Sequence, residues 1–372
     1  MQLIETEQGQ ALAERLGIDV LELNPHAPRP FVFSELAACL CQSVQQAGHD
    51  CRHLINQRPG PGRVALVFVP APGWEDFVST LDRQRTVLIN LEQFGSDSAL
   101  IVNGHIDKLL SWPLADYITA NVDYLRRTQV LKHAVCELPF VPGSAAIFRP
   151  ELATEKSVDV LFFGSLNERR QRVLAQIEAA GLTVETVSGA YAWELTPAIL
   201  RARLVLHVHF YETRLFPIAR MLQPVANGVP VVCETSVHSR LSDWSQSGMV
   251  FAEYDALAAA CVALLGSPQR QLDSAQRCLR FARQVDFDAA FKALLAGLAA
   301  QPSPVATRPT LEETVHAEAL AEATQLPPES HLPAPRPFAL AQRTPGTGRF
   351  GRLPVVLFLL FVVMSIWQSM KN

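Results

Sequence analysis

The feature that most constrains the fold of this chain is a regular alternation of apolar runs and amphipathic stretches in its second half. Apolar runs that predict strands lie at residues 158–163, 183–187, 204–208, 229–233 and 249–251. Helical periodicity fills the intervals, at residues 168–180, 196–202, 216–226, 241–246 and 256–265. Continuously apolar strands alternating with helices are typical of a parallel sheet with helices on both faces. The pattern predicts a doubly wound α/β domain.

The first half repeats this pattern less regularly. Apolar runs at 31–33, 64–69, 86–91 and 116–119 predict strands, with helical periodicity at 34–46 and 121–131. The stretch VPGSAAIFRPELATE at 141–155 carries Gly and Pro between the two units, which predicts a hinge. We therefore expect two Rossmann-like domains, residues 1–145 and 146–300, which face each other across a cleft. The carboxyl ends of parallel strands form such a cleft, so chemistry is expected there.

The last 70 or so residues differ from the rest of the chain in composition. Ten of the 26 prolines lie within 301–354, which predicts a semi-rigid linker over 301–352, with a short helical stretch at 311–324. The run LPVVLFLLFVVMSIW starts at Leu353, and no charge follows until Lys371. As a helix, 353–370 spans about 27 Å, close to the thickness of a bilayer core. It predicts a single-pass membrane anchor; the alternatives are a buried terminal core helix or a surface amphipathic helix.

Charge and composition limit the remaining possibilities. Three arginines (343, 349 and 352) precede the apolar run, so the positive-inside rule predicts a cytoplasmic globular part. No apolar segment opens the chain, so we expect no secretory signal. The 49% hydrophobic content excludes general disorder, and the net charge of -4 argues against a nucleic-acid binder. The seven cysteines form no C-x-x-C pair, so we expect reduced thiols; Cys39, Cys41, His49 and Cys51 are a weak candidate metal set.

One segment, DVLFFGSLNERR at 159–170, combines a buried strand, a glycine and a helix start. Gly164 allows a ligand to approach the backbone, and Ser165 and Asn167 are good helix caps. Because a helix N-terminus attracts anions, Arg169 and Arg170 are well placed to add bonds to phosphate oxygens. The alternative is an ordinary capped turn with solvent-facing arginines.

A second segment, LVLHVHFYETRLFPIARMLQPVANGVPVVCE at 204–234, places polar residues after two strands. His207 and His209 share one strand face, as a metal pair or as buried imidazoles. Glu212 and Glu234 fall at strand ends, where carboxylates accept bonds from sugar hydroxyls or remain surface charges. A third segment, TVLINLEQF at 86–94, ends in polar residues that contact an acceptor or only cap the turn.

These segments together resemble a known family. In order and approximate spacing, DVLFFGSLNERR, LHVHFYE and ANGVPVVCE resemble the donor-binding domain of GT-B glycosyltransferases of the broad "group 1" type. TVLINLEQF with DYITANVDYL is similar to the acceptor-side domain of a bacterial subset of these enzymes. The resemblance covers about residues 30–290 and leaves the linker and the tail unexplained.

The resemblance implies metal-independent transfer of a sugar from a nucleotide diphosphate sugar, without a cofactor. It implies basic residues after the glycine strand that bind the diphosphate, here Arg169 or Arg170. The site expected from the resemblance and from these strand ends comprises, for catalysis, His209 and Glu212; for donor binding, Gly164, Ser165, Asn167, Arg169, Arg170, Tyr211, Arg220, Gln223, Asn227, Gly228 and Glu234; and on the acceptor side, Asn90, Glu92 and Gln93.

The sequence departs from the family at one motif. Two glutamates seven residues apart often flank the family's donor site, and alignment on Asn227-Gly228-Val229-Pro230 places them at Leu215 and Gln223. Three functions therefore stay open. The first is a transferase tethered to a bacterial inner membrane, acting on a glycan or lipid-linked acceptor. The second is an inactive scaffold of a membrane complex, and the third, least favoured, is a sugar-nucleotide epimerase.

Overall fold

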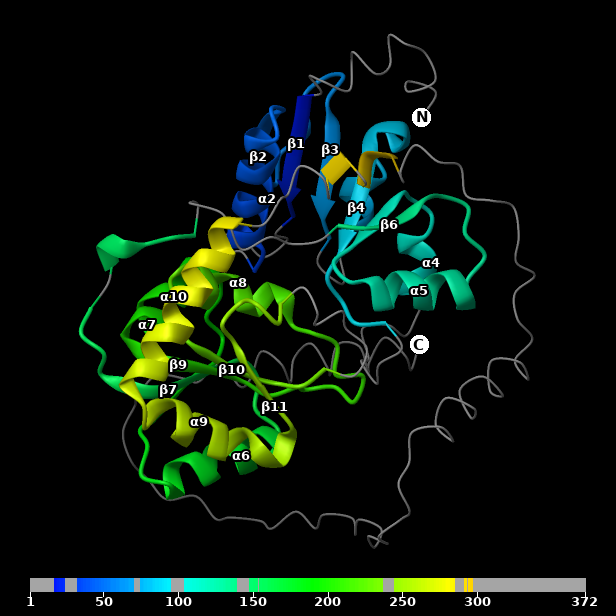
Figure 1. Ribbon diagram of the computed structural model, residues 1–372. Helices are drawn as coiled ribbons and strands as arrows, with labels where there is room; N and C mark the ends of the chain where they lie inside the picture. Colours follow the sequence, from blue (N-terminus) through cyan, green and yellow to red (C-terminus); the bar gives the residue numbers. More distant parts are fainter. Residues whose placement is uncertain are drawn as a thin grey trace, which may run out of the picture. The chain divides into compact units, whose positions relative to one another are not determined.

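The computed structural model describes residues 17–23, 32–69, 74–94, 104–138, 147–152, 154–236, 244–284, 291–292 and 294–296. The chain divides into two compact units, Met1–Pro309 and Thr310–Asn372, and every described residue belongs to the first. Two fully parallel sheets of six and five strands lie within that unit (Figure 1). The predicted α/β class with two Rossmann-like sheets is confirmed.

The first sheet has the strand order β2-β1-β3-β4-β5-β6. Its strands are β1 (Gly17–Glu22), β2 (Asp50–Ile55), β3 (Val64–Phe68), β4 (Thr86–Asn90), β5 (Leu114–Asp116) and β6 (Val135–Glu137). Its helices are α2 (Ser34–Gln46), α3 (Glu75–Val78), η2 (Arg83–Arg85), α4 (His105–Leu109) and α5 (Thr119–Thr128). Alternate strand residues pack on opposite faces: Val20 and Leu66 lie in one core cluster with α2, and Leu21 and Val67 in another with α4 and α5.

The second sheet has the order β11-β10-β9-β7-β8. Its strands are β7 (Val158–Phe163), β8 (Val184–Val187), β9 (Ala202–His207), β10 (Val231–Glu234) and β11 (Val250–Ala252). Its helices are η4 (Pro150–Leu152), α6 (Glu168–Ala179), η5 (Ala192–Glu194), α7 (Thr196–Arg201), α8 (Ile218–Ala226), η6 (Tyr254–Ala256), α9 (Leu257–Leu265) and α10 (Pro268–Gln284). Core clusters join α6 and α9 to one face of this sheet, and α7 and α8 to the other.

Several predicted elements of the first half are wrong. No strand begins at Val32, because Val32 and Phe33 form a turn that leads into α2, where the Phe33 ring stacks on Phe68 at 5.7 Å. The strand expected at 116–119 is β5, which ends at Asp116, while Thr119 already begins α5. In the second half, residues 244–246 of the helix expected at 241–246 form a turn. The strands β1, β2 and β6 were not predicted.

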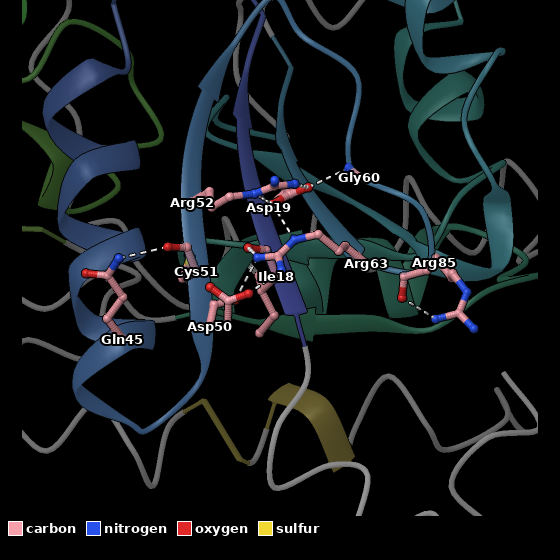
Figure 2. Close-up of polar contacts among 10 residues, drawn as sticks. Ile18, Asp19, Gln45, Asp50, Cys51, Arg52, Gly60, Arg63 and Arg85 are labelled. Atoms are coloured by element: carbon pink, nitrogen blue, oxygen red, sulfur yellow. Dashed lines mark hydrogen bonds and ion pairs between the residues drawn. The ribbon is translucent and has the colours of Figure 1, made fainter.

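A buried polar network holds the outer edge of the first sheet. The Asp19 carboxylate, with no exposed surface, accepts bonds from Arg52 Nη2 at 2.6 Å, Arg63 Nε at 2.7 Å and the Gly60 amide at 2.8 Å (Figure 2). Burial raises the pKa of Asp19, but these three donors outweigh it and hold the pKa below its usual value. The network therefore ties β1 to β2 and to the loop before β3.

The predictions for the C-terminal part concern residues outside the described ones. These are the linker at 301–352 with its helical stretch at 311–324, and the anchor at 353–370. Seven positions of the expected hinge, 141–146 and 153, lie outside them as well. In the portion of the chain that the structure describes, no helix is long and apolar enough to cross a membrane.

Candidate functional site

The loop between β7 and α6 is built as the sequence predicts. Asn167 is the N-cap of α6, and its side-chain oxygen accepts a bond from the Arg170 amide at 3.0 Å. Such a cap leaves other first-turn N–H groups free, next to the positive end of the helix dipole. Ser165 is exposed in this loop. The arrangement suits an anion bound at the carboxyl end of β7.

Gly164 is required in this loop because Arg220 lies against it. Its φ of +124° strains any other residue, and an added Cβ would lie 2.4 Å from Arg220 Nη1. Arg220, from α8, donates from Nη1 to the Phe163 carbonyl at 2.7 Å. Burial lowers the pKa of Arg220, and within the described segments no carboxylate pairs with it.

Arg170 lies beneath the same loop with only 2% of its surface exposed. Its guanidinium donates from Nε to the Val208 carbonyl at 2.9 Å and from Nη1 to the Ser165 carbonyl at 2.7 Å. Burial, followed by the charges of Arg220 and Arg169, lowers the pKa of Arg170 to about 9. Arg170 therefore fixes the loop through its carbonyl bonds. It also adds a positive charge that forms no ion pair with a carboxylate among the described residues.

Arg169 already has an anionic partner. Its guanidinium forms a two-pronged ion pair with Glu234 at the end of β10, with a 2.6 Å bond from Nη1 to Oε2. The Tyr254 ring lies 4.0 Å from the Arg169 guanidinium carbon, and the Tyr254 hydroxyl donates to the Arg169 carbonyl at 2.8 Å. Glu234 is only 1% exposed and also accepts the His209 amide at 2.8 Å. The structure thus places Glu234 against Arg169 and the backbone.

Two buried histidines, His207 and His209, lie at the same end of the sheet. The centres of their rings are 5.1 Å apart, and His209 Nε2 is 3.1 Å from Ser236 Oγ. Burial lowers the pKa of His209 to about 4, so its imidazole is neutral at pH 7. Burial, with the nearby His209 and arginines, lowers the pKa of His207 well below its usual value, and among the described residues its Nε2 has no hydrogen-bond partner. The site is therefore positively charged through its arginines alone.

Two predicted donor-binding residues, Gln223 and Asn227, make side-chain bonds within the protein. The Gln223 amide donates to the Ala192 carbonyl at 2.8 Å and accepts from the Thr196 hydroxyl at 3.1 Å. Asn227 is the C-cap of α8, and its side chain bonds the Arg149 amide and the Ile147 carbonyl, both at 2.9 Å. Gly228 follows with a φ of +65°, as expected of a helix stop. These side chains fasten α8 to neighbouring backbone.

The other predicted residues lie on two loops. Tyr211 and the exposed Glu212 follow β9, and the Tyr211 ring packs edge-on against Phe210 at 5.1 Å. In the first sheet, Asn90 ends β4, and Glu92 and Gln93 follow it. Gln93 Oε1 accepts a 2.9 Å bond from Thr213 Oγ1, so the loops after β4 and β9 touch. Catalytic roles for His209 and Glu212 stay predictions.

Sequence reasoning missed Ser236 and Tyr254. Ser236 stands two positions after Glu234 at the end of β10, so the two-residue strand period was a usable signal. Tyr254 follows β11 and contacts Arg169 across 85 positions, which no local pattern indicates.

Metal binding stays untested. No group of three ligand-type side chains suited to a metal occurs in the described ranges, and Cys39, Cys41, His49 and Cys51 form no such group. The sequence does carry one Asp-x-Asp pair, Asp286 and Asp288, of the kind that assists metal binding in some glycosyltransferases. Both aspartates lie outside the described residues.

Comparisons with known proteins are sparse at the level of sequence. No family model matches the chain. Two uncharacterized proteins of Acanthamoeba polyphaga mimivirus are each 27% identical to it, over 139 and 108 residues, or 37% and 28% of this chain. The matches cover only 16% and 15% of those proteins' own lengths.

Solved structures show weak overall likeness. Sucrose-phosphate synthase from Thermosynechococcus elongatus is 12% identical over 77% of this chain and 99% of its own, with a TM-score of 0.48. T4 phage BGT in complex with UDP and Mn2+ is 12% identical over 75% of this chain and 99% of its own, with a TM-score of 0.47. AviGT4, a glycosyltransferase involved in avilamycin A biosynthesis, is 13% identical over 76% of this chain and 98% of its own, with a TM-score of 0.46. Scores below 0.5 assign nothing by themselves, so the fold rests on the two parallel sheets.

Proposed function

We propose that this chain is a GT-B-type glycosyltransferase that binds a nucleotide diphosphate sugar at the carboxyl ends of β7, β9 and β10. The observation that carries the proposal is a surplus of buried positive charge. Arg170 and Arg220 make their hydrogen bonds to backbone carbonyls, while among the described residues Glu234 forms its ion pair with Arg169 and accepts the His209 amide. The three guanidiniums lie close enough for Arg220 and Arg169 to lower the pKa of Arg170. A bound diphosphate relieves that repulsion.

The proposed chemistry requires stabilisation of a leaving group. As the bond between the sugar and the phosphate breaks, negative charge develops on the diphosphate, and Arg220 with the first-turn amides of α6 stabilises it. Arg170 keeps the loop carbonyls of Ser165 and Val208 in place, so the donors are fixed before the ligand arrives. His209 acts as a neutral imidazole at pH 7. Transfer without a metal stays part of the proposal.

We further propose a glycan or lipid-linked acceptor, and tethering to the cytoplasmic face of a bacterial inner membrane through residues 353–370. Support for the tether is the uncharged run after Arg352 and the arginines that precede it. Support for the acceptor is the resemblance of the loop after β4 to acceptor-side domains.

A binding experiment tests the proposal. We expect calorimetry with UDP, GDP and ADP to show binding of at least one, and Arg220→Gln to weaken it by about 10- to 100-fold, as for lost bonds between charged groups. The matched control is Arg203→Gln, at the amino-terminal end of β9, whose guanidinium pairs with Asp159 at 2.7 Å and the Leu265 carbonyl at 3.0 Å. The folded full chain should then hydrolyse a matching nucleotide sugar in EDTA as well as in Mg2+.

A non-catalytic scaffold is the second candidate, and the geometry of Gln223 favours it. Its amide nitrogen and oxygen each bond a group inside the protein, at the position where the family has a donor-binding glutamate. A scaffold need not bind any nucleotide. If the folded chain shows neither binding heat nor thermal stabilisation with any of the three diphosphates, the scaffold is favoured over the enzyme.

A further inference from the structure

The loop that follows β4 is held by an unusual number of side-chain bonds to its backbone. Asn90 Nδ2 and Asn121 Nδ2 both donate to the Glu92 carbonyl, at 2.9 Å and 2.7 Å. The Glu92 amide donates to Asn90 Oδ1 at 3.2 Å, and the Phe94 amide to Asn121 Oδ1 at 3.0 Å. Two asparagines thus fix the backbone of a three-residue loop on both sides.

A buried carboxyl group holds the two asparagines in turn. Asp116, at the end of β5, accepts from Asn90 Nδ2 at 2.7 Å, from Asn121 Nδ2 at 3.1 Å and from the Ile118 amide at 3.1 Å. It has no exposed surface, and burial raises its pKa to about 8. Since every polar partner of this group lies inside the protein, Asp116 is a support for the loop.

The Glu92 side chain, unlike its backbone, is not held by hydrogen bonds among the described residues. It is partly exposed, and across the described segments no hydrogen bond or ion pair engages its carboxylate. Burial raises the pKa of Glu92, and Tyr117 is a titratable group close enough for the two to interact. A carboxyl group without a partner, carried on a backbone that is held in place, is the arrangement that a proton-accepting catalyst needs.

The position of the loop links this carboxylate to the donor side. Gln93, the next residue, accepts from Thr213 in the loop after β9, four positions beyond His209. Glu92 therefore lies on the first-sheet loop that meets the loop of the candidate donor site.

We propose that Glu92 is the general base that activates the acceptor hydroxyl, with Asn90, Asn121 and Asp116 as positioning residues. This proposal rests on the proposed glycosyltransferase function. The Glu92 carboxylate takes the hydroxyl proton as the acceptor oxygen forms its bond to the anomeric carbon. The bond from that carbon to the diphosphate oxygen breaks, and the electron pair leaves on the diphosphate. Glu92 then releases the proton to water.

The test compares Glu92→Gln with Glu137→Gln in the full chain. Glu137 ends β6 in the same sheet and lies near Asp116, but its carboxylate accepts a 2.5 Å bond from Thr119 Oγ1. Because the acceptor is unidentified, the assay is slow hydrolysis of UDP-glucose, GDP-mannose or ADP-glucose, whichever the wild type turns over. Water then takes the acceptor's place.

We expect Glu92→Gln to lower kcat by about 100-fold or more, within the range for general-base catalysis, and to keep the wild-type affinity for the nucleoside diphosphate. The wild-type kcat should rise with pH as Glu92 ionises, and the variant should lose that rise. Glu137→Gln should keep both. Hydrolysis by Glu92→Gln within threefold of the wild type, or an unchanged pH profile, overturns the base assignment alone. A wild type that binds and hydrolyses none of these donors overturns the proposed function and this proposal with it.

Discussion

At the scale of single residues, Gly164 is the position where the backbone and the candidate site depend most closely on each other. We expect Gly164→Ala to destabilise the protein by about 1–3 kcal/mol, the usual cost of a strained backbone conformation. The new methyl group also displaces the Arg220 guanidinium, which lies 2.4 Å from its position. Affinity for a nucleoside diphosphate should therefore fall together with stability. Urea unfolding and calorimetric titration measure the two effects.

The control for this prediction is Gly181→Ala, just after α6. Gly181 has a φ of +85°, and nothing lies within 4 Å of an added Cβ. This variant suffers backbone strain without touching the arginines, so it should lose stability and keep its affinity. If both variants bind the diphosphate equally well, Arg220 has no part in binding.

At the scale of elements, the β1–β2 edge depends on one buried carboxylate. We expect Asp19→Asn to destabilise the protein by about 3 kcal/mol, the low end for breaking a buried ion pair, since Arg52 keeps 47% of its side chain exposed. The folded-state pKa of Asp19 lies below its usual value, so its contribution is present above about pH 4 and is lost as the pH falls through the folded pKa. Urea unfolding at pH 7 and pH 3 should therefore show the difference shrinking at acid pH.

Asp50→Asn is the matched control on the same network. Its carboxylate also pairs with Arg63, but the Asp50 side chain is 69% exposed (Figure 2). Exposed pairs contribute less than about 1 kcal/mol, so this variant should unfold almost like the wild type. If Asp19→Asn and Asp50→Asn lose the same free energy of unfolding, burial of Asp19 does not determine how much it stabilises the protein.

The same edge shows what sequence reasoning can and cannot recover. β7 was predicted with its observed bounds because helices cover both faces of its sheet, so the apolar run Val160 to Phe163 fills most of the strand, and Asp159 lies near its partly exposed start. β1 was missed because the buried Asp19 and Glu22 interrupt its apolar pattern, and their partners lie 30 or more positions away or on another element. Local patterns predicted the Asn167 cap and the Gly228 helix stop. They gave no sign that Glu234 pairs with Arg169 or that Gln223 and Asn227 bond the backbone.

At the scale of the compact unit Met1–Pro309, the two sheets share a core. Leu36 and Ala37 of α2 belong to the same buried cluster as Leu195 and Ile199 near η5 and α7. Glu35 lies in this region with 8% of its surface exposed, and its Oε2 has no hydrogen-bond partner in the part of the chain that the structure describes. Burial raises the pKa of Glu35 to about 8, with a small addition from the charge of Glu22, and it outweighs the lowering by hydrogen bonds to the Glu35 backbone and to Gln223. The contact between the sheets therefore contains a carboxyl group that is neutral at pH 7.

This gives stability a pH dependence of definite sign. The folded state keeps the Glu35 proton up to about pH 8, whereas the unfolded state loses it near pH 4.5, so stability falls as pH rises between these values. The full difference is on the order of 5 kcal/mol at most.

Glu35→Gln, which is neutral at every pH, should unfold like the wild type at pH 5 and become progressively more stable than it toward pH 9. Glu178→Gln, on the exposed face of α6, should follow the wild type throughout. Because other buried carboxyl groups such as Asp116 titrate in both proteins, the difference between the two urea curves isolates Glu35. A difference that stays constant from pH 5 to pH 9 would mean that Glu35 ionises normally and reaches water between the sheets.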